Sequence, residues 1–138
     1  FNQLNSLLSM MNENEMYQIE TKEKIIDLII NDKNYLCFHQ DLNYLNITKA
    51  SLFVKQKEYS KAIEYLKIAK EHAIKYDELM KQGKHIFTTP FLNLYEIDLK
   101  EIVRTGEKTE LEEFIKDAKD KRFTPLKDFN EYQKLISN

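Results

Sequence analysis

Three histidines and a single cysteine are the side chains of this chain best suited to metal or nucleophilic chemistry. His39, His72 and His85 are far apart in the sequence. None has a second ligand four residues away, the spacing that places two metal ligands on one face of a helix. The sequence therefore predicts no metal site. Cys37 has no histidine or aspartate placed as in a nucleophile pattern, so we expect it to be a small buried hydrophobic residue.

Motifs of the common enzyme classes are also missing from the sequence. Ser51, Ser60 and Ser137 belong to no nucleophile elbow and to no lysine-paired motif. The only two glycines, Gly83 and Gly106, are too far apart to form a glycine-rich phosphate loop. A group of glutamates is better explained by the dipole at a helix N-terminus than by acid–base catalysis: Glu107, Glu110, Glu112 and Glu113. We predict no catalytic residue, no cofactor and no enzyme activity.

The composition favours one all-α domain. The chain has 138 residues, enough for a single core, and only two glycines and two prolines. Charged residues make up 32% and the net charge is −2, which describes a well-solvated surface without a dominant sign. Only Arg104 and Arg122 are arginines among the 21 basic residues. Arginine is the usual reader of guanine, so this chain by itself is a poor candidate for nucleic-acid binding.

The same features indicate where the protein works. No apolar run approaches the roughly 18 residues that a membrane span needs, and no signal peptide is visible. A single cysteine excludes an internal disulfide and fits a reducing compartment. We therefore predict a cytoplasmic protein without a membrane partner. The chain starts at Phe1, without methionine and within a helical pattern, so we expect it to be a fragment of something longer.

Apolar periodicity predicts four helices in the first part of the chain, at about 2–11, 15–30, 36–55 and 60–80. The segment 31–34 consists of turn-forming residues, and Gly83 would close the fourth helix. We expect at least three quarters of the ordered residues to be helical. At most a short pair of strands is expected, near 85–92.

The rest of the chain is less regular. Thr89 and Pro90 fit the start of a helix that would carry Phe91, Leu94, Tyr95 and Ile102 on one face, but an irregular or extended connection over 85–105 is an equal alternative. Thr109–Glu112 is a capping box that opens a helix. Pro125 fixes a bend, with Phe123 and Leu126 expected to pack onto the preceding helix. A last short helix covers about 129–136.

The stretch KQKEYSKAIEYLKIA at 55–69 resembles the middle of a tetratricopeptide repeat, where one helix ends, turns, and a second begins. Tyr59, Ala62, Leu66 and Ala69 occupy the repeat's packing positions, with spacings that place them on one helical face. The resemblance implies one domain over 1–138 built from tetratricopeptide-like antiparallel helical hairpins. Its best repeat is at 42–80, a degenerate repeat at 1–31, and a C-terminal helical tail at 85–138.

Several positions depart from the repeat pattern. Asn46 and Lys49 stand where the family usually has a large aromatic residue and a leucine, and Lys57 replaces the turn glycine. The second helix of the hairpin is also longer than in a standard repeat and lacks its terminal proline. The resemblance therefore supports one good repeat and one degenerate one.

Three short segments, HAIKYD at 72–77, TTPFLN at 88–93 and RFTPLKD at 122–128, are similar to a second pattern. They resemble the C-terminal sensor region of bacterial helix-turn-helix (XRE-type) transcriptional regulators with tetratricopeptide-like helices. The resemblance covers roughly 42–136. It implies a region that senses a ligand or peptide and dimerises. No recognition-helix pattern is found in 1–34, so DNA would be bound only through an upstream domain absent from this chain.

Two functions follow from these resemblances. The first is the ligand- or peptide-sensing and dimerisation region of a cytoplasmic regulator, and the alternative is a stand-alone tetratricopeptide scaffold for protein interaction. In either, the repeat's concave face would bind protein or peptide through Tyr44, Ile47, Thr48, Ser51, Val54 and Lys55. The N-terminal helices or the tail could instead cover that face. A homodimer is expected through an uncapped apolar face formed by Leu4, Leu7, Leu8 and Met11.

Overall fold

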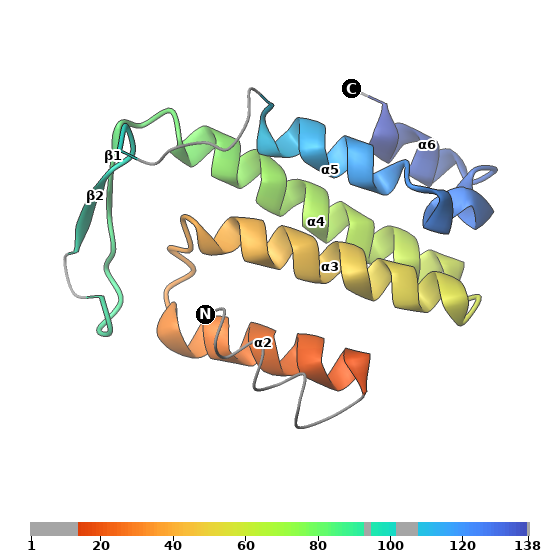
Figure 1. The fold of residues 1–138 in the computed structure, drawn as a ribbon, viewed down its shortest axis with the longest axis horizontal. Helices are drawn as coiled ribbons and strands as arrows, with labels where there is room; N and C mark the ends of the chain where they lie inside the picture. The colour runs from red at the N-terminus through yellow and green to blue at the C-terminus, as the bar shows by residue number, and fades with distance from the viewer. Residues whose placement is uncertain (1–13, 93–94, 102–107, 138) are drawn as a thin grey trace.

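The computed structural model describes residues 14–92, 95–101 and 108–137 (Figure 1). Its elements are α2 (Glu15–Ile29), α3 (Phe38–Lys55), α4 (Tyr59–Leu79), β1 (Lys84–Ile86), β2 (Glu96–Asp98), α5 (Glu110–Ala118), the 3-10 helix η1 (Lys121–Leu126) and α6 (Asn130–Ile136). Helices comprise 66% and strands 5% of this part of the chain. The fold is mostly helical, as expected, but it falls short of three quarters because the segment between α4 and α5 contains strands and turns.

The helices α3 and α4 form the antiparallel hairpin on which the other elements pack (Figure 1). Ala62 is fully buried in one core cluster with Ala50 of α3, as the packing pattern predicted. Near the turn, Phe53 and Tyr65 stack with ring centroids 5.3 Å apart and an interplanar angle of 3°. Lys57 makes the turn with a φ of 62°, the left-handed conformation for which the family pattern has glycine.

The C-terminal elements fold back over this hairpin. The predicted capping box is present, with the Thr109 side chain accepting a hydrogen bond from the Glu112 N–H at the start of α5. Phe123 and Leu126 of η1 are fully buried, as expected for the bend. The Tyr132 hydroxyl of α6 donates to the Ala118 carbonyl at 2.7 Å and ties the two C-terminal helices together.

The strands β1 and β2 form a small β-hairpin, and 84–92 and 95–101 contain no helix, so the extended alternative is correct for these residues. Leu94 and Ile102 of the predicted helical face lie outside the described residues. β1 and β2 pair antiparallel, with His85 opposite Ile97. The Thr89 hydroxyl donates to the Ile29 carbonyl at 2.5 Å and therefore caps no helix of its own. Phe87 is buried in a second cluster with Ile30, Leu36 and Leu99, which fixes the β-hairpin to the 30–37 connection.

Gly83 does not close α4 as predicted. The helix ends at Leu79, and Gly83 lies further along, in the turn before β1, with a φ of 83°. Its carbonyl accepts a hydrogen bond from the Leu99 N–H at 2.9 Å. Among the helices in the described ranges, none is both long enough and apolar enough to cross a membrane.

Candidate functional site

The concave face predicted from the repeat pattern is largely filled. Ile47 is 1% exposed, and Ile47 and Val54 belong to the main core together with Phe114 of α5 and Leu126 of η1. Ser51 is buried as well. The prediction of a peptide groove along this face is therefore wrong for these residues, because the C-terminal tail packs there and removes it from solvent.

The remaining three residues of that set are not core residues, and a binding role for them stays a prediction. Tyr44 is 63% exposed, and the Thr48 hydroxyl is engaged in donating to the Tyr44 carbonyl at 2.9 Å. Lys55 is exposed at the last residue of α3. The predicted dimer face, Leu4, Leu7, Leu8 and Met11, lies outside the described residues and stays a prediction.

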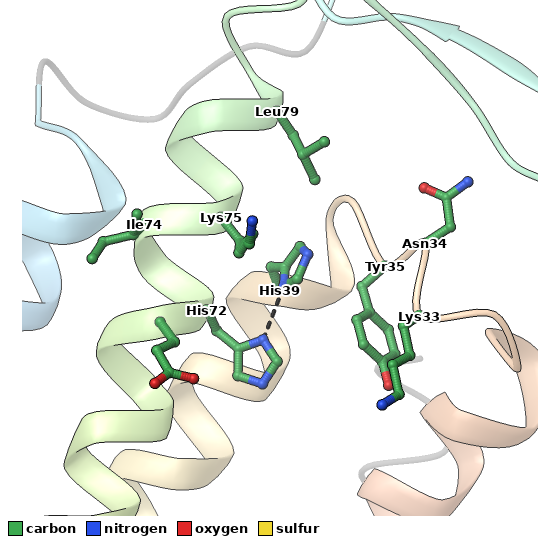
Figure 2. Close-up of a pocket in the computed structure, with 9 residues that line it drawn as sticks. Lys33, Asn34, Tyr35, His39, His72, Ile74, Lys75 and Leu79 are labelled. Carbon is green, nitrogen blue, oxygen red and sulfur yellow. Dashed lines mark hydrogen bonds between the residues drawn. The ribbon is translucent and has the colours of Figure 1, made fainter.

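A pocket of about 560 Å³ opens at the end of the α3–α4 hairpin that is far from the Lys57 turn (Figure 2). Its walls come from the first turn of α3, the last two turns of α4 and the connection between α2 and α3. The lining residues are Lys33, Asn34, Tyr35, His39, Glu71, His72, Ile74, Lys75 and Leu79. Pockets of 300–1,000 Å³ with mainly apolar walls and a few polar groups are typical of small-molecule sites.

Two histidines meet in this pocket. Nδ1 of His39 and Nδ1 of His72 are 2.8 Å apart, and the ring centroids are 5.1 Å apart (Figure 2). A hydrogen bond between two ring nitrogens needs one proton between them. In the neutral pair, one ring therefore carries its proton on Nδ1 and donates, while the other accepts and carries its proton on Nε2.

Tyr35 packs edge-on against both histidines, with its ring centroid 5.4 Å from that of His39 and 6.1 Å from that of His72. Its hydroxyl donates to Asp27 Oδ1 of α2 at 2.8 Å. Burial, together with this hydrogen bond and the Asp27 charge, raises the pKa of Tyr35 to about 12. Tyr35 therefore remains a neutral aromatic wall at physiological pH.

The connection that carries Tyr35 is held in place by local geometry. Lys33 and Leu36 have φ angles of 63° and 44°, so the chain turns sharply on both sides of the tyrosine. The Leu36 side chain is fully buried below it. Asn34 Nδ2 donates to the Ile86 carbonyl of β1 at 2.8 Å, which couples the pocket wall to the β-hairpin.

The electrostatics of the pocket keep both histidines neutral. Burial, together with the positive charges of His72, Lys75 and His85, lowers the pKa of His39 to about 4. Burial also lowers the pKa of His72, although the Glu71 carboxylate acts in the opposite direction. At pH 7 the empty pocket thus presents one Nε2–H donor and one Nε2 acceptor.

Sequence reasoning missed this pair, although the hairpin contained a signal for it. In an antiparallel hairpin, residues equally far from the turn lie opposite each other. Phe53 and Lys61 are each four residues from Lys57, and Lys61 Nζ lies 5.3 Å from the Phe53 ring centroid. His39 and His72 are 18 and 15 residues from Lys57. These two separations differ by less than one helical turn, so the same rule places the two histidines near each other.

Cys37 also differs from its prediction. It is exposed at the start of α3 and is not a core residue. Partial shielding of its thiol and the nearby Asp41 carboxylate raise the pKa of Cys37, so its thiol is not activated as a nucleophile.

Comparison of the chain with protein-family models, with curated proteins and with solved structures finds no match. The resemblance to tetratricopeptide repeats and to XRE-type regulators therefore stays a prediction. The fold and the pocket define a coarser class, a mostly helical domain with a ligand-sized cavity at the open end of its central hairpin.

Proposed function

We propose that this chain is a sensor domain that binds a small effector in the pocket of His39 and His72, and that it acts within a transcriptional regulator. The observation that supports the sensor role best is the pocket itself, with an apolar wall and two neutral histidines that offer one donor and one acceptor. Cys37, the one cysteine of the chain, does not line this pocket, and its thiol pKa is raised.

The surroundings of the pocket support a mechanism by population shift. One wall, the connection around Tyr35, contacts the β-hairpin at two points: Asn34 donates to the Ile86 carbonyl of β1, and Asp32 accepts a hydrogen bond from Thr88 in the loop that follows. An effector that favours one position of this wall would therefore bias the β-hairpin as well. In a regulator, that shift would alter the spacing of DNA-binding modules located elsewhere in the protein.

The proposal is tested by blocking the pocket. Leu79→Trp enlarges a side chain that points into the cavity (Figure 2), whereas Ile68→Trp alters a half-buried residue of the same helix outside the lining. Thermal unfolding is measured for the wild type and both variants with small carboxylic acids, amines, nucleosides and short peptides. We expect at least one compound to raise the Tm of the wild type and of Ile68→Trp but not that of Leu79→Trp. A panel in which no compound distinguishes the variants contradicts the sensor role.

A scaffold for protein interaction is the second candidate, and a different observation favours it. Three large apolar side chains of the 84–98 segment are exposed: Ile86, Phe91 and Tyr95. Under this alternative, the β-hairpin binds a partner protein and the pocket plays no part. Replacing Phe91 and Tyr95 by serine would then abolish partner binding, while Leu79→Trp would leave it intact.

Homodimerisation is the remaining part of the regulator proposal, and it rests on the sequence pattern of Leu4, Leu7, Leu8 and Met11. Sedimentation at micromolar concentration is expected to give a dimer. A monomer whose mass and stability are unaffected by Leu7→Glu would show that this segment is neither an interface nor part of the core.

A further inference from the structure

The histidine pair can accept one proton without a change of geometry, and only one. The ring that donates through Nδ1 can be protonated on its free Nε2, which leaves the Nδ1–H···Nδ1 bond intact. A second proton would have to sit between the two Nδ1 atoms, where one proton already lies. Protonation therefore turns a neutral donor-and-acceptor pair into a pair with two Nε2–H donors and a charge of +1.

The pocket favours an anion as the partner of that charge. Lys33 and Lys75 line it, against a single lining carboxylate, Glu71. Among the described residues, Lys75 forms an ion pair with the exposed Glu78, at 3.5 Å, and its side chain lies close to His39 in Figure 2. These cations also argue against a metal ion, and the described part of the chain has no cluster of three metal-ligating side chains.

The charged groups around the pair come from every neighbouring element. On α4 these are Glu71 and Lys75, and on α2 it is Asp27, whose carboxylate is engaged by the Tyr35 hydroxyl. The connection contributes Lys33 and also Asp32, which accepts a hydrogen bond from Thr88, and β1 contributes His85. Asp27 and Asp32 are thus already paired by hydrogen bonds, which leaves the lysines to meet an incoming anion.

The rest of the lining selects the body of the ligand. The Tyr35 ring, Ile74 and Leu79 form an apolar wall, and the volume of about 560 Å³ accommodates an aromatic ring with a short side chain. A carboxylate accepts hydrogen bonds through both oxygens, which suits two Nε2–H donors.

We propose, building on the sensor function above, that the pocket binds a small aromatic carboxylate and that binding is coupled to the uptake of one proton by the His39–His72 pair. The empty pair is neutral at pH 7 because burial opposes its charge. A bound carboxylate supplies the counter-charge and favours the protonated form. Affinity therefore increases as the pH falls, by up to about tenfold per pH unit where the free pair is neutral and the complex is protonated.

Calorimetry on the whole chain tests this. Benzoate, phenylacetate and indole-3-acetate are titrated between pH 5.5 and 8, alongside the matching neutral amides. Each titration is repeated in two buffers of different ionisation enthalpy, which yields the number of protons taken up. We expect the carboxylates to bind more tightly than the amides at pH 6, with proton uptake that approaches one. Binding of the amides should not depend on pH.

Variants assign the proton. His72→Gln keeps a hydrogen-bonding side chain that cannot titrate, so it should remove the pH dependence and the proton uptake. His85→Gln changes the one other histidine, outside the lining, and should retain both. Lys75→Gln should weaken carboxylate binding at every pH and keep the slope. If His72→Gln does not fold, as judged by circular dichroism, the proton count of the wild type decides by itself.

The outcomes separate this inference from the sensor function. Equal affinity for carboxylates and amides, or carboxylate binding without proton uptake, overturns the inference even if Leu79→Trp abolishes binding, and in that case the pocket remains an effector site. If none of the three carboxylates and three amides binds, the proposed ligand class is also overturned. The sensor function itself is tested separately, by the panel of compounds in the thermal-unfolding experiment.

Discussion

Lys57 holds the central turn in a conformation that suits glycine better than lysine. Its φ of 62° costs a residue with a Cβ atom about 1 kcal/mol. We predict that Lys57→Gly stabilises the protein by roughly 0.5 kcal/mol, since the relief of strain exceeds the entropy that glycine adds to the unfolded chain. Chemical denaturation measures the change. Lys57→Val should destabilise, because β-branched residues tolerate positive φ least. A stabilising valine would show that strain plays no part at this turn.

A second lysine, Lys49, occupies a position where the repeat pattern has a leucine, and an ion pair compensates for the burial of its charge. Lys49 is buried on α3, pairs with Glu23 of α2, and lies 5.0 Å from the centroid of the Tyr65 ring. Removal of one partner of a mostly buried pair leaves the other charge without compensation.

We predict that Lys49→Met costs about 2 kcal/mol, less than the 3–5 kcal/mol of a fully buried pair because Glu23 is partly exposed. Adding Glu23→Gln to this variant should restore most of the loss. A double-mutant cycle measured by chemical denaturation provides the coupling. Additive effects of the two substitutions would mean that the ion pair contributes little to the link between α2 and α3.

At the scale of elements, one carboxylate of α4 attaches α5 to the hairpin. Asp77 is buried, and its two oxygens accept from the Glu110 and Leu111 N–H groups, each at 3.0 Å. The Glu110 side chain in turn accepts from Gln40 and Asn43 of α3. The N-terminus of α5 is thus bonded to both helices of the hairpin.

We predict that Asp77→Ala costs about 1.5–3 kcal/mol, the range for hydrogen bonds to a charged group. Thr109→Ala, which removes only the local cap, should cost about 1 kcal/mol. The two variants should also differ in where they loosen the fold. Hydrogen exchange is expected to show loss of protection throughout α5 and η1 in Asp77→Ala, and only in the first turn of α5 in Thr109→Ala. Equal patterns would contradict the attachment role.

The elements that the sequence predicted well are those with local signals. The spacing of Tyr59, Ala62, Leu66 and Ala69 indicated the hairpin, and the Thr109–Glu112 capping box marked the start of α5. The segment 84–98 lacked such a signal. Its strands contain three residues each, and Thr89 is held by a carbonyl 60 residues away. A contact so distant in the sequence leaves no local pattern.

The pocket was less predictable for a related reason. The turn-forming segment 31–34 predicted that the chain turns here. The position of the pocket also depends on positive φ at Lys33 and Leu36, and neither lysine nor leucine favours that conformation. The predicted concave face failed because the pattern of one hairpin contains no information about which distant element covers it. Ile47 and Val54 become core residues because α5 and η1 pack against them in the folded chain.

At the scale of the whole molecule, the buried histidines make stability depend on pH. The pKa of His39 falls from an ordinary value of 6.5 to about 4 on folding, so the unfolded chain binds more protons between these values. Its contribution to stability is therefore fully present above pH 6.5 and is lost as the pH falls towards 4. Asp41, whose pKa is raised by burial, acts in the opposite direction at the acidic end.

We predict that the free energy of unfolding decreases between pH 7 and pH 5, and that His39→Gln flattens this decrease. The largest contribution that His39 could make is about 3 kcal/mol over its full range. Urea denaturation at pH 7, 6 and 5 measures the free energy of unfolding of the wild type and of His39→Gln. Asp41 is present in both proteins, so its effect cancels in the difference between them. Parallel curves for the two proteins would show that the buried imidazole does not govern the pH dependence.

The pocket opens at the end of the α3–α4 hairpin farthest from the turn, and this position has a kinetic consequence. Contacts near Lys57 close the shortest loop, so we expect them to form early in folding, whereas His39 and His72 meet late. A ligand that binds between them stabilises the native state more than the folding transition state. It should therefore slow unfolding and leave the refolding rate nearly unchanged. An occupied pocket would lengthen the lifetime of the folded domain. The half-life of the protein would therefore increase with the concentration of the effector.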